Sequence, residues 1–179
     1  MNEKYQNLIN ECVSRFPDNS RNIFLELSEY AVSLGYTPKW VKIRIDGKPV
    51  NGNALTFTKN KVKKMLIRIR PEKNPFAKDM PCLALRYFAS SNYSDIFKQG
   101  VKRVIEEFNG RYTGCYGCGK CAKGKLEGYI YTYPDGKKVF RCGGEPIELP
   151  PISADNIPEI KQLMKKQDDY FLEMVEFTK

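Results

Sequence analysis

Four cysteines are the residues of this chain best suited to chemistry. Cys115, Cys118 and Cys121 lie in the run RYTGCYGCGKCAKG, and Cys142 follows in FRCGG. Four thiolates are the number of ligands that a tetrahedral metal site needs. Because the chain contains no histidine, thiolate is its only soft ligand, and any transition-metal site must consist chiefly of sulfur. The pattern predicts a metal site at these cysteines, and zinc is the metal that we expect.

The spacing of the cysteines leaves more than one interpretation open. Cys115-Tyr116-Gly117-Cys118-Gly119-Lys120 resembles the zinc knuckle of zinc ribbons and rubredoxin-like sites, in which glycines let backbone N–H groups turn toward the sulfurs. A zinc ribbon supplies a second two-cysteine knuckle, whereas here the fourth cysteine arrives alone. The C-x2-C-x2-C spacing is also similar to that of single 4Fe-4S cluster sites, although glycine rather than proline follows Cys142. A redox-active Cys115–Cys118 pair and plain reduced thiols are the remaining alternatives.

The expected role of the metal is structural. Four cysteine ligands fill the coordination shell of zinc and leave no open position for a water molecule. Such a site would staple a small hairpin that has few core residues of its own. Cys12 belongs to the apolar stripe of a helix and Cys82 to a strand, so we interpret both as buried hydrophobic residues.

The absence of histidine also excludes several classes of enzyme. No Ser-His-Asp triad, no Cys-His pair and no His-ligated zinc enzyme can be built from this chain alone. The sequence contains neither the phosphate-binding G-x-x-x-x-G-K-[ST] loop nor a G-x-G-x-x-G motif after a strand. We therefore predict no catalytic residues and expect a non-enzymatic protein, with a thiolate at Cys118 as the conceivable exception.

Positive charge is concentrated in the first part of the chain. Residues 1–126 hold 23 basic and 11 acidic side chains, whereas residues 127–179 hold 7 basic and 10 acidic ones. A basic sheet face with an aromatic residue suits a phosphate backbone and a stacked base, so nucleic acid is one expected partner. A small acidic molecule clamped by arginines is another, and a solvated or helix-covered face is the alternative without a ligand. The predicted binding residues are Trp40, Lys42, Arg44, Lys64, Arg68, Arg70 and Arg86.

The elements that must position these residues follow from the hydrophobic periodicity. Two helices precede Gly35, and a four-stranded antiparallel meander is predicted between Trp40 and Phe88. A third helix runs from Tyr93 to Phe108, and a hairpin with a Pro-Asp-Gly turn follows the cysteine run. A final helix follows Pro150-Pro151, so the predicted fold class is α+β.

The predicted organisation has three parts. Residues 1–110 form the sheet domain, 111–149 the four-cysteine knuckle and hairpin, and 150–179 a C-terminal helix that docks on the domain. Tyr129, Tyr131 and Tyr133 project from one face of the hairpin, and we interpret them as packing residues with ligand stacking as the alternative. No apolar run is long enough to span a membrane and the first residues lack a signal-peptide core, so we expect a soluble, cytoplasmic protein.

Overall fold

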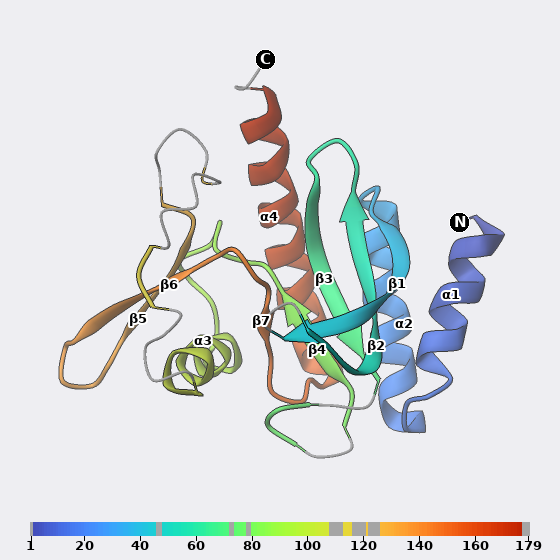
Figure 1. Cartoon of the computed structure of the whole chain (residues 1–179), viewed down its shortest axis with the longest axis horizontal. Helices are drawn as coiled ribbons and strands as arrows, with labels where there is room; N and C mark the ends of the chain where they lie inside the picture. Colours follow the sequence, from blue (N-terminus) through green and yellow to red (C-terminus); the bar gives the residue numbers. More distant parts are fainter. Residues whose placement is uncertain are drawn as a thin grey trace.

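The computed structural model describes residues 2–45, 48–71, 74–77, 80–107, 113–115, 121 and 126–176; for 43–45 and 48–51 it describes the backbone alone. The described residues confirm an α+β fold, with elements in roughly the predicted order (Figure 1). The helices are α1 (Glu3–Val13), α2 (Asp18–Ser33), α3 (Asp95–Glu107) and α4 (Ile157–Glu176), the last preceded by a short 3-10 turn (Ala154–Asn156). The strands are β1 (Thr37–Ile45), β2 (Lys48–Lys59), β3 (Lys64–Arg70), β4 (Cys82–Leu85), β5 (Gly128–Thr132), β6 (Lys138–Cys142) and β7 (Ile147–Glu148).

The described strands form a large antiparallel sheet in the order β1-β2-β3-β4-β7 and a separate β5–β6 hairpin. The meander of β1 to β4 was predicted, but β7 was not. β2 also begins earlier than expected, because Ile45 pairs with Lys48 and extends the ladder into a stretch predicted as loop. β7 pairs with β4 through Ala84 and Glu148, and so adds a fifth strand at the edge of the sheet.

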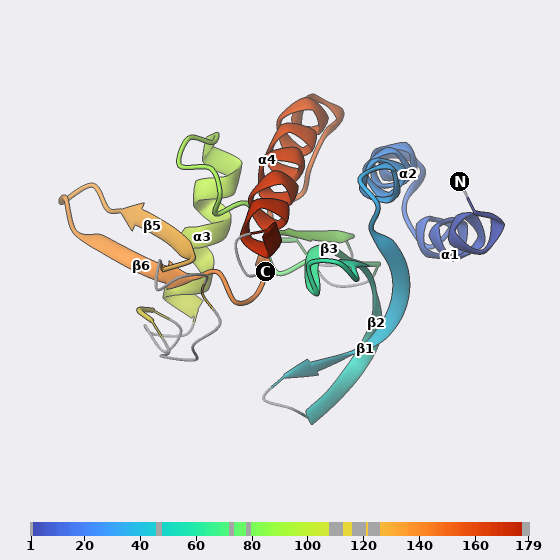
Figure 2. The ribbon, with the colours of Figure 1, turned by 90° about the horizontal axis from the view of Figure 1, so that it is seen from above.

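One face of the large sheet is covered by helices. Figure 2 shows α2 and α4 lying on the same side of this sheet, with α1 beside α2. Because cross-strand partners point to the same face, the register places a continuous apolar layer beneath these helices. The layer consists of fully buried or nearly fully buried residues, namely Leu55, Phe57, Ile67, Ile69, Leu83, Leu85 and Ile147.

A buried polar contact joins α4 to the sheet. The Lys59 Nζ atom lies 2.6 Å from Asp168 Oδ1, and the Tyr36 hydroxyl donates to the same oxygen at 3.0 Å. The Lys59 ammonium also lies 5.0 Å from the centre of the Tyr36 ring. Gly35 has φ +88°, a conformation that favours glycine, and its missing Cβ leaves room for the Lys59 side chain. Burial and the neighbouring Asp168 carboxylate raise the pKa of Tyr36, so its hydroxyl remains a donor.

The hairpin joins the body through an aromatic cluster. Tyr129 is 2% exposed, and its ring centre lies 4.8 Å from that of Tyr87 and 6.1 Å from that of Phe88. The Tyr129 hydroxyl also accepts a hydrogen bond from the Tyr87 backbone N–H at 3.2 Å. Tyr131 packs against the same core. The structure therefore confirms the packing interpretation for Tyr129 and Tyr131.

β7 is held by a close approach to α3. A Cβ atom on Gly100 would lie 2.9 Å from Ile147 Cγ2 and 3.0 Å from the Glu148 carbonyl oxygen. Only a glycine fits there without a shift of the strand. The contact positions the Glu148 side chain at the edge of the large sheet, close to the arginines of β3.

Candidate functional site

Backbone contacts place the segment before Cys115 beside β6, the strand that ends at Cys142. Thr113 forms an isolated bridge with Arg141, and the Gly114 N–H donates to the Phe140 carbonyl at 2.8 Å. Cys115 therefore follows a segment that is paired with the end of β6, the strand that closes on Cys142. The backbone thus carries Cys115 toward the same end of the hairpin as Cys142.

Cys121 reaches this end of the hairpin by another contact. The Glu127 backbone N–H donates to Cys121 Sγ at 3.5 Å, which is the type of N–H to sulfur contact expected in a zinc knuckle. The Glu127 carboxylate accepts a hydrogen bond from the Tyr170 hydroxyl at 3.2 Å and lies 3.9 Å from Lys64 Nζ. Lys64, predicted to belong to the basic sheet face, therefore lies beside the cysteine-bearing segment. Burial raises the pKa of Tyr170 to about 12.

The described cysteines differ in their surroundings. Cys115 is exposed, Cys121 is half-buried and Cys142 is buried, while Cys118 lies outside the described residues. In the described part of the chain, no three His, Cys, Asp or Glu residues lie close enough to hold a metal ion. Because one of the predicted ligands is outside that part, the four-cysteine metal site stays a prediction.

Cys12 and Cys82 lie away from the hairpin base. Both are almost fully buried, as their apolar positions predicted. Burial raises the pKa of each thiol to about 12. They are therefore neutral, unreactive core residues at neutral pH.

The arginines of β3 meet an acidic residue from β7. Arg70 lies 2.7 Å from the Glu148 carboxylate, and Arg68 lies 3.6 Å from it. Arg103 of α3 reaches the other Glu148 oxygen at 3.4 Å. We call Arg68, Arg70 and Arg103 around Glu148 the arginine cluster. Arg68 also lies 3.8 Å from Glu145, whose side chain is 67% exposed.

Arg86 is a more deeply buried cation next to this cluster. Its residue is 8% exposed, and its guanidinium donates to the Met65 carbonyl at 3.2 Å and to the Gly144 carbonyl. Among the described residues no carboxylate lies within ion-pair distance of it, and its Nε has no hydrogen-bond partner. Burial is the main cause of its lowered pKa. Through Gly144, Arg86 links the sheet to the segment that follows Cys142.

The expectation that Trp40 shares the face of Arg68 and Arg70 was wrong. Trp40 pairs with Leu55, which pairs with Ile69, whereas Arg68 pairs with Thr56. Trp40 therefore lies on the helix side of the sheet. There its indole N–H donates to Glu11 at 3.2 Å and its ring lies 5.2 Å from the Arg15 guanidinium carbon. The physical reason is that α1 covers this end of β1. An indole ring, which is apolar but carries one N–H donor, is as stable against a helix as it is in solvent.

The remaining predicted basic residues are not gathered with the cluster. Lys42 is exposed and pairs with Asn53, on the same side of β1 as Trp40. The ladder is irregular between Lys42 and Arg44, and the Arg44 side chain lies outside the described part. Of the predicted set, the structure thus brings Arg68 and Arg70 together, with Arg86 nearby.

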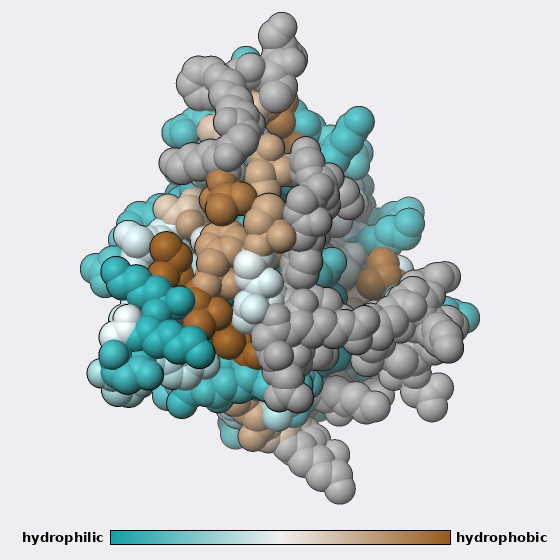
Figure 3. All heavy atoms as spheres, turned by 60° about the vertical axis from the view of Figure 1, so that its left-hand side comes forward, coloured by the Kyte–Doolittle hydropathy of each residue, from teal (hydrophilic) through white to brown (hydrophobic). Residues whose placement is uncertain are grey.

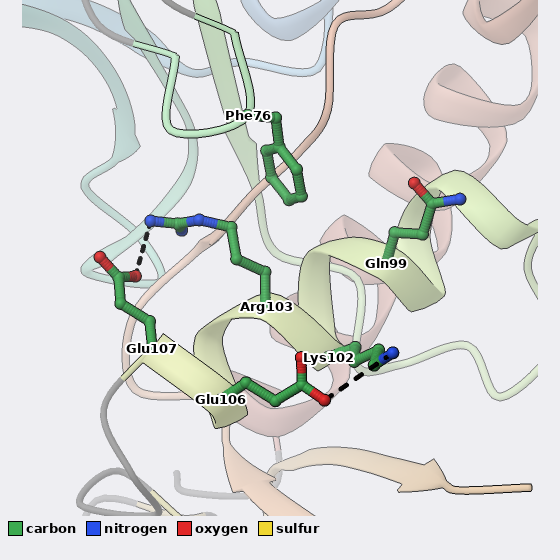
Figure 4. A pocket seen from close by; sticks show the side chains of 6 residues that line it. All are labelled: Phe76, Gln99, Lys102, Arg103, Glu106 and Glu107. Carbon is green, nitrogen blue, oxygen red and sulfur yellow. Dashed lines mark ion pairs between the residues drawn. The ribbon is translucent and has the colours of Figure 1, made fainter.

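A shallow hollow adjoins the cluster. It has a volume of about 450 Å³, and Figure 4 shows the Arg103 side chain extending between Phe76 and Glu107. The guanidinium carbon lies 5.3 Å from the centre of the Phe76 ring, and the Arg103–Glu107 ion pair measures 2.6 Å. The other lining residues are Gln99, Lys102 and Glu106. Arg103 therefore belongs to both the hollow and the arginine cluster.

Arg103, Glu145 and Glu148 were missed by the sequence reasoning. The usable signal was the acidic segment that follows Cys142, Gly143-Gly144-Glu145-Pro146-Ile147-Glu148, in a chain whose preceding part is strongly basic. The sequence signal for Arg103 was its i, i+4 spacing to Glu107, which is common on solvated helix faces and does not indicate a site.

Comparisons with known proteins add no family to these observations. No family model matches the chain, and no curated protein and no solved structure matches it significantly. Within the described ranges, no helix has the length and apolarity needed to cross a membrane.

Proposed function

We propose that this protein is a non-enzymatic anion-binding protein. Its arginine cluster binds a small acidic molecule, a carboxylate or a phosphate, and its four cysteines hold a zinc ion that staples the hairpin. The observation that carries the anion site is the convergence of three guanidinium groups on the single carboxylate of Glu148.

The buried part of the cluster has more cations than carboxylates, which favours a further anion. Glu148 is 15% exposed and faces three cations. The other carboxylates in reach, Glu145 and Glu107, are 67% and 42% exposed, and ion pairs of exposed groups are weak in water. Arg68 Nε is buried without a partner among the described residues. Guanidinium groups bind carboxylates and phosphates with two parallel hydrogen bonds, which suits this arrangement.

The enclosure of the arginines favours a small ligand over nucleic acid. The side chains of Arg68, Arg70 and Arg103 are 22%, 15% and 20% exposed. A phosphate backbone needs a row of exposed cations, and a stacked base needs an aromatic ring on the same surface. Trp40, the predicted stacking residue, lies on the opposite face of the sheet. We therefore propose a small acidic molecule as the ligand.

Calorimetric titration with citrate, inorganic phosphate and a single-stranded oligonucleotide tests the anion site. We expect citrate or phosphate to bind the wild type and Arg68→Gln to lose most of that affinity. Glu145→Gln should bind several-fold more tightly, because the exposed Glu145 carboxylate competes for Arg68. This gain cannot result from misfolding. Arg21→Gln, at an exposed helix position, is the matched control and should bind as the wild type does.

Two results would contradict the anion site. The first is that neither citrate nor phosphate binds the wild type or Glu145→Gln. The second is that Arg68→Gln and Arg21→Gln bind equally well. Tighter binding of the oligonucleotide than of both small anions would replace the small ligand with nucleic acid.

The zinc staple is supported by the position of the cysteines. Cys121 accepts a backbone N–H bond, and Cys142 ends a two-stranded hairpin that is too small to be stable by itself. A metal that joins them would connect the hairpin base to the preceding loop, and its binding free energy would add to that of folding. The alternative function is a small iron-sulfur or thiol redox protein, which the same four cysteines would serve.

Elemental analysis and a visible spectrum, on protein purified without oxygen, distinguish these possibilities. We expect one zinc per chain and no colour. Cys121→Ser and Cys142→Ser should lower the zinc content, whereas Cys12→Ala and Cys82→Ala, which remove thiols outside the proposed site, should leave it unchanged. A brown protein with iron and sulfide would assign a cluster instead. A metal-free protein that readily forms a disulfide would assign a redox pair.

A further inference from the structure

The outer face of the β5–β6 hairpin carries exposed apolar side chains. Leu126 and Ile130 are the large hydrophobic residues that the described chain leaves exposed, at 54% and 64%. Figure 3 shows apolar residues gathered on the side of the molecule that carries the hairpin. Ile130 opposes Phe140 in the ladder, so the two side chains share this face. Exposed apolar side chains become a candidate interaction surface where they adjoin a strand edge whose backbone groups are free to pair.

The backbone of β5 forms such an edge. The Tyr133 N–H donates to the Lys137 carbonyl at 2.9 Å and the Gly143 N–H donates to the Glu127 carbonyl at 2.8 Å. Hydrogen-bonded pairs alternate along an antiparallel ladder. These two bonds therefore show which residues of β5 point their backbone N–H and C=O groups away from β6. On β5 the outward-facing residues are Gly128, Ile130 and Thr132.

The two edges of the hairpin differ in their backbone hydrogen bonds. On β6 the outward Phe140 carbonyl accepts the Gly114 N–H. On β5 no described residue pairs with the outward N–H and C=O groups. The strand GYIYT has no charge, no proline and no bulge, the devices by which proteins commonly protect a free edge. The unprotected edge and the exposed Ile130 thus coincide.

We propose that this edge pairs with the same edge of a second copy of the chain. The outward positions are symmetric about Ile130, so an antiparallel two-fold pairing places Ile130 opposite its own copy and Gly128 opposite Thr132. The same axis brings Leu126 next to Pro134 of the second copy. Both exposed apolar residues then gain apolar neighbours, and β5 and β6 become half of a four-stranded sheet.

A second copy suits this edge better than a peptide of other sequence. The five residues carry no charge by which a charged peptide could be selected, and a second copy supplies an equally exposed apolar side chain, its own Ile130, opposite Ile130. One strand pair buries less surface than a permanent complex needs. We therefore expect a reversible dimer with a dissociation constant on the order of 100 µM, which belongs to the weak class of interfaces.

Sedimentation velocity of the full chain, over a concentration series that brackets this value, tests the dimer. The wild type should shift from monomer to dimer, and Ile130→Lys should weaken the association at least tenfold, because it places like charges opposite each other. Lys138→Glu is the matched control: it lies on the same outer face but on β6, and should dimerise as the wild type does.

A cross-linking variant keeps the proposal testable if Ile130→Lys fails to fold. Ile130→Cys, oxidised with copper phenanthroline, should yield a covalent dimer whose bridge joins the two introduced thiols in a peptide map. A wild type that stays monomeric throughout the series would overturn the proposal. So would a dimer that Ile130→Lys leaves intact, or an edge that binds a short uncharged peptide without self-association.

Discussion

The large sheet and the β5–β6 hairpin are stabilised in different ways. The sheet buries the central part of one face beneath α2 and α4, and the apolar layer there is almost inaccessible to solvent. The hairpin instead depends on Tyr129, which enters an aromatic cluster of the body. Two strands cannot bury an apolar face by themselves. The contrast teaches that the clustered cysteines occur where apolar packing is thinnest, which is where a covalent or metal link stabilises most.

The largest expected effect removes the anchor of the hairpin. Tyr129→Ala should lower the free energy of unfolding by about 4 kcal/mol, because it empties a fully buried aromatic site. Urea denaturation measures this value. Tyr133→Ala, at a half-buried position near the hairpin tip, is the control and should cost about 1 kcal/mol. Equal losses of stability in the two variants would mean that Tyr129 does not anchor the hairpin. The hairpin and the large sheet would then not differ in the way described above.

The second prediction concerns the body. Asp168→Asn should destabilise the protein by about 3 kcal/mol, because it leaves the Lys59 ammonium, 14% exposed, without its carboxylate. Asp169→Asn removes the neighbouring, half-exposed partner of Lys165 and should cost far less, because ion pairs of exposed groups are weak in water. Denaturation curves of the two variants compare a buried ion pair with a surface one. Similar losses would show that Lys59 is solvated and that α4 is held by apolar packing alone.

The smallest expected effect concerns a buried thiol in the large sheet of the body. Burial raises the pKa of Cys82 from 9.0 to about 12, so its stabilising contribution is fully present below pH 9 and is lost between pH 9 and pH 12. At pH 10.5 the loss amounts to about 2 kcal/mol. Denaturation at pH 8 and pH 10.5 should therefore show a smaller alkaline loss in Cys82→Ala than in the wild type.

Leu83→Ala is the control for this measurement, because it removes a buried side chain of the same strand that carries no ionisable group. Its alkaline loss of stability should equal that of the wild type. If Cys82→Ala kept the full loss, the Cys82 thiol would be ionised in the folded protein, and the core of the body would be wetter than its burial indicates.

The periodic elements could be predicted because local pattern and burial agree in them. The stripe of α3, the alternation in β3 and the Pro-Asp-Gly turn of the hairpin all appear in the structure where the sequence indicates them. β7 could not be predicted, because two residues have no period. Its position depends on the space that Gly100 leaves on a distant helix, and nothing in the local sequence records that contact.

For each contact of the candidate site, one of the two residues could be predicted from the sequence and its partner could not. Arg68 and Arg70 are conspicuous in β3, but the residue that organises them, Glu148, comes from a segment far along the chain. The face on which Trp40 lies depends on the register with β2, and the hydrophobic pattern of β1 alone indicated the other face. Partners from distant segments and strand register are tertiary properties, so a single sequence leaves them undetermined.

The position of β7 has a consequence for how the chain folds. β4 and β7 pair directly, and the loop between Leu85 and Ile147 contains α3, the cysteine run and the whole hairpin. Closing a long loop costs chain entropy before any contact forms. A link between the cysteines would shorten the free chain within this loop. We therefore expect zinc to accelerate the closing of the large sheet, a rate effect that would act far from the metal itself.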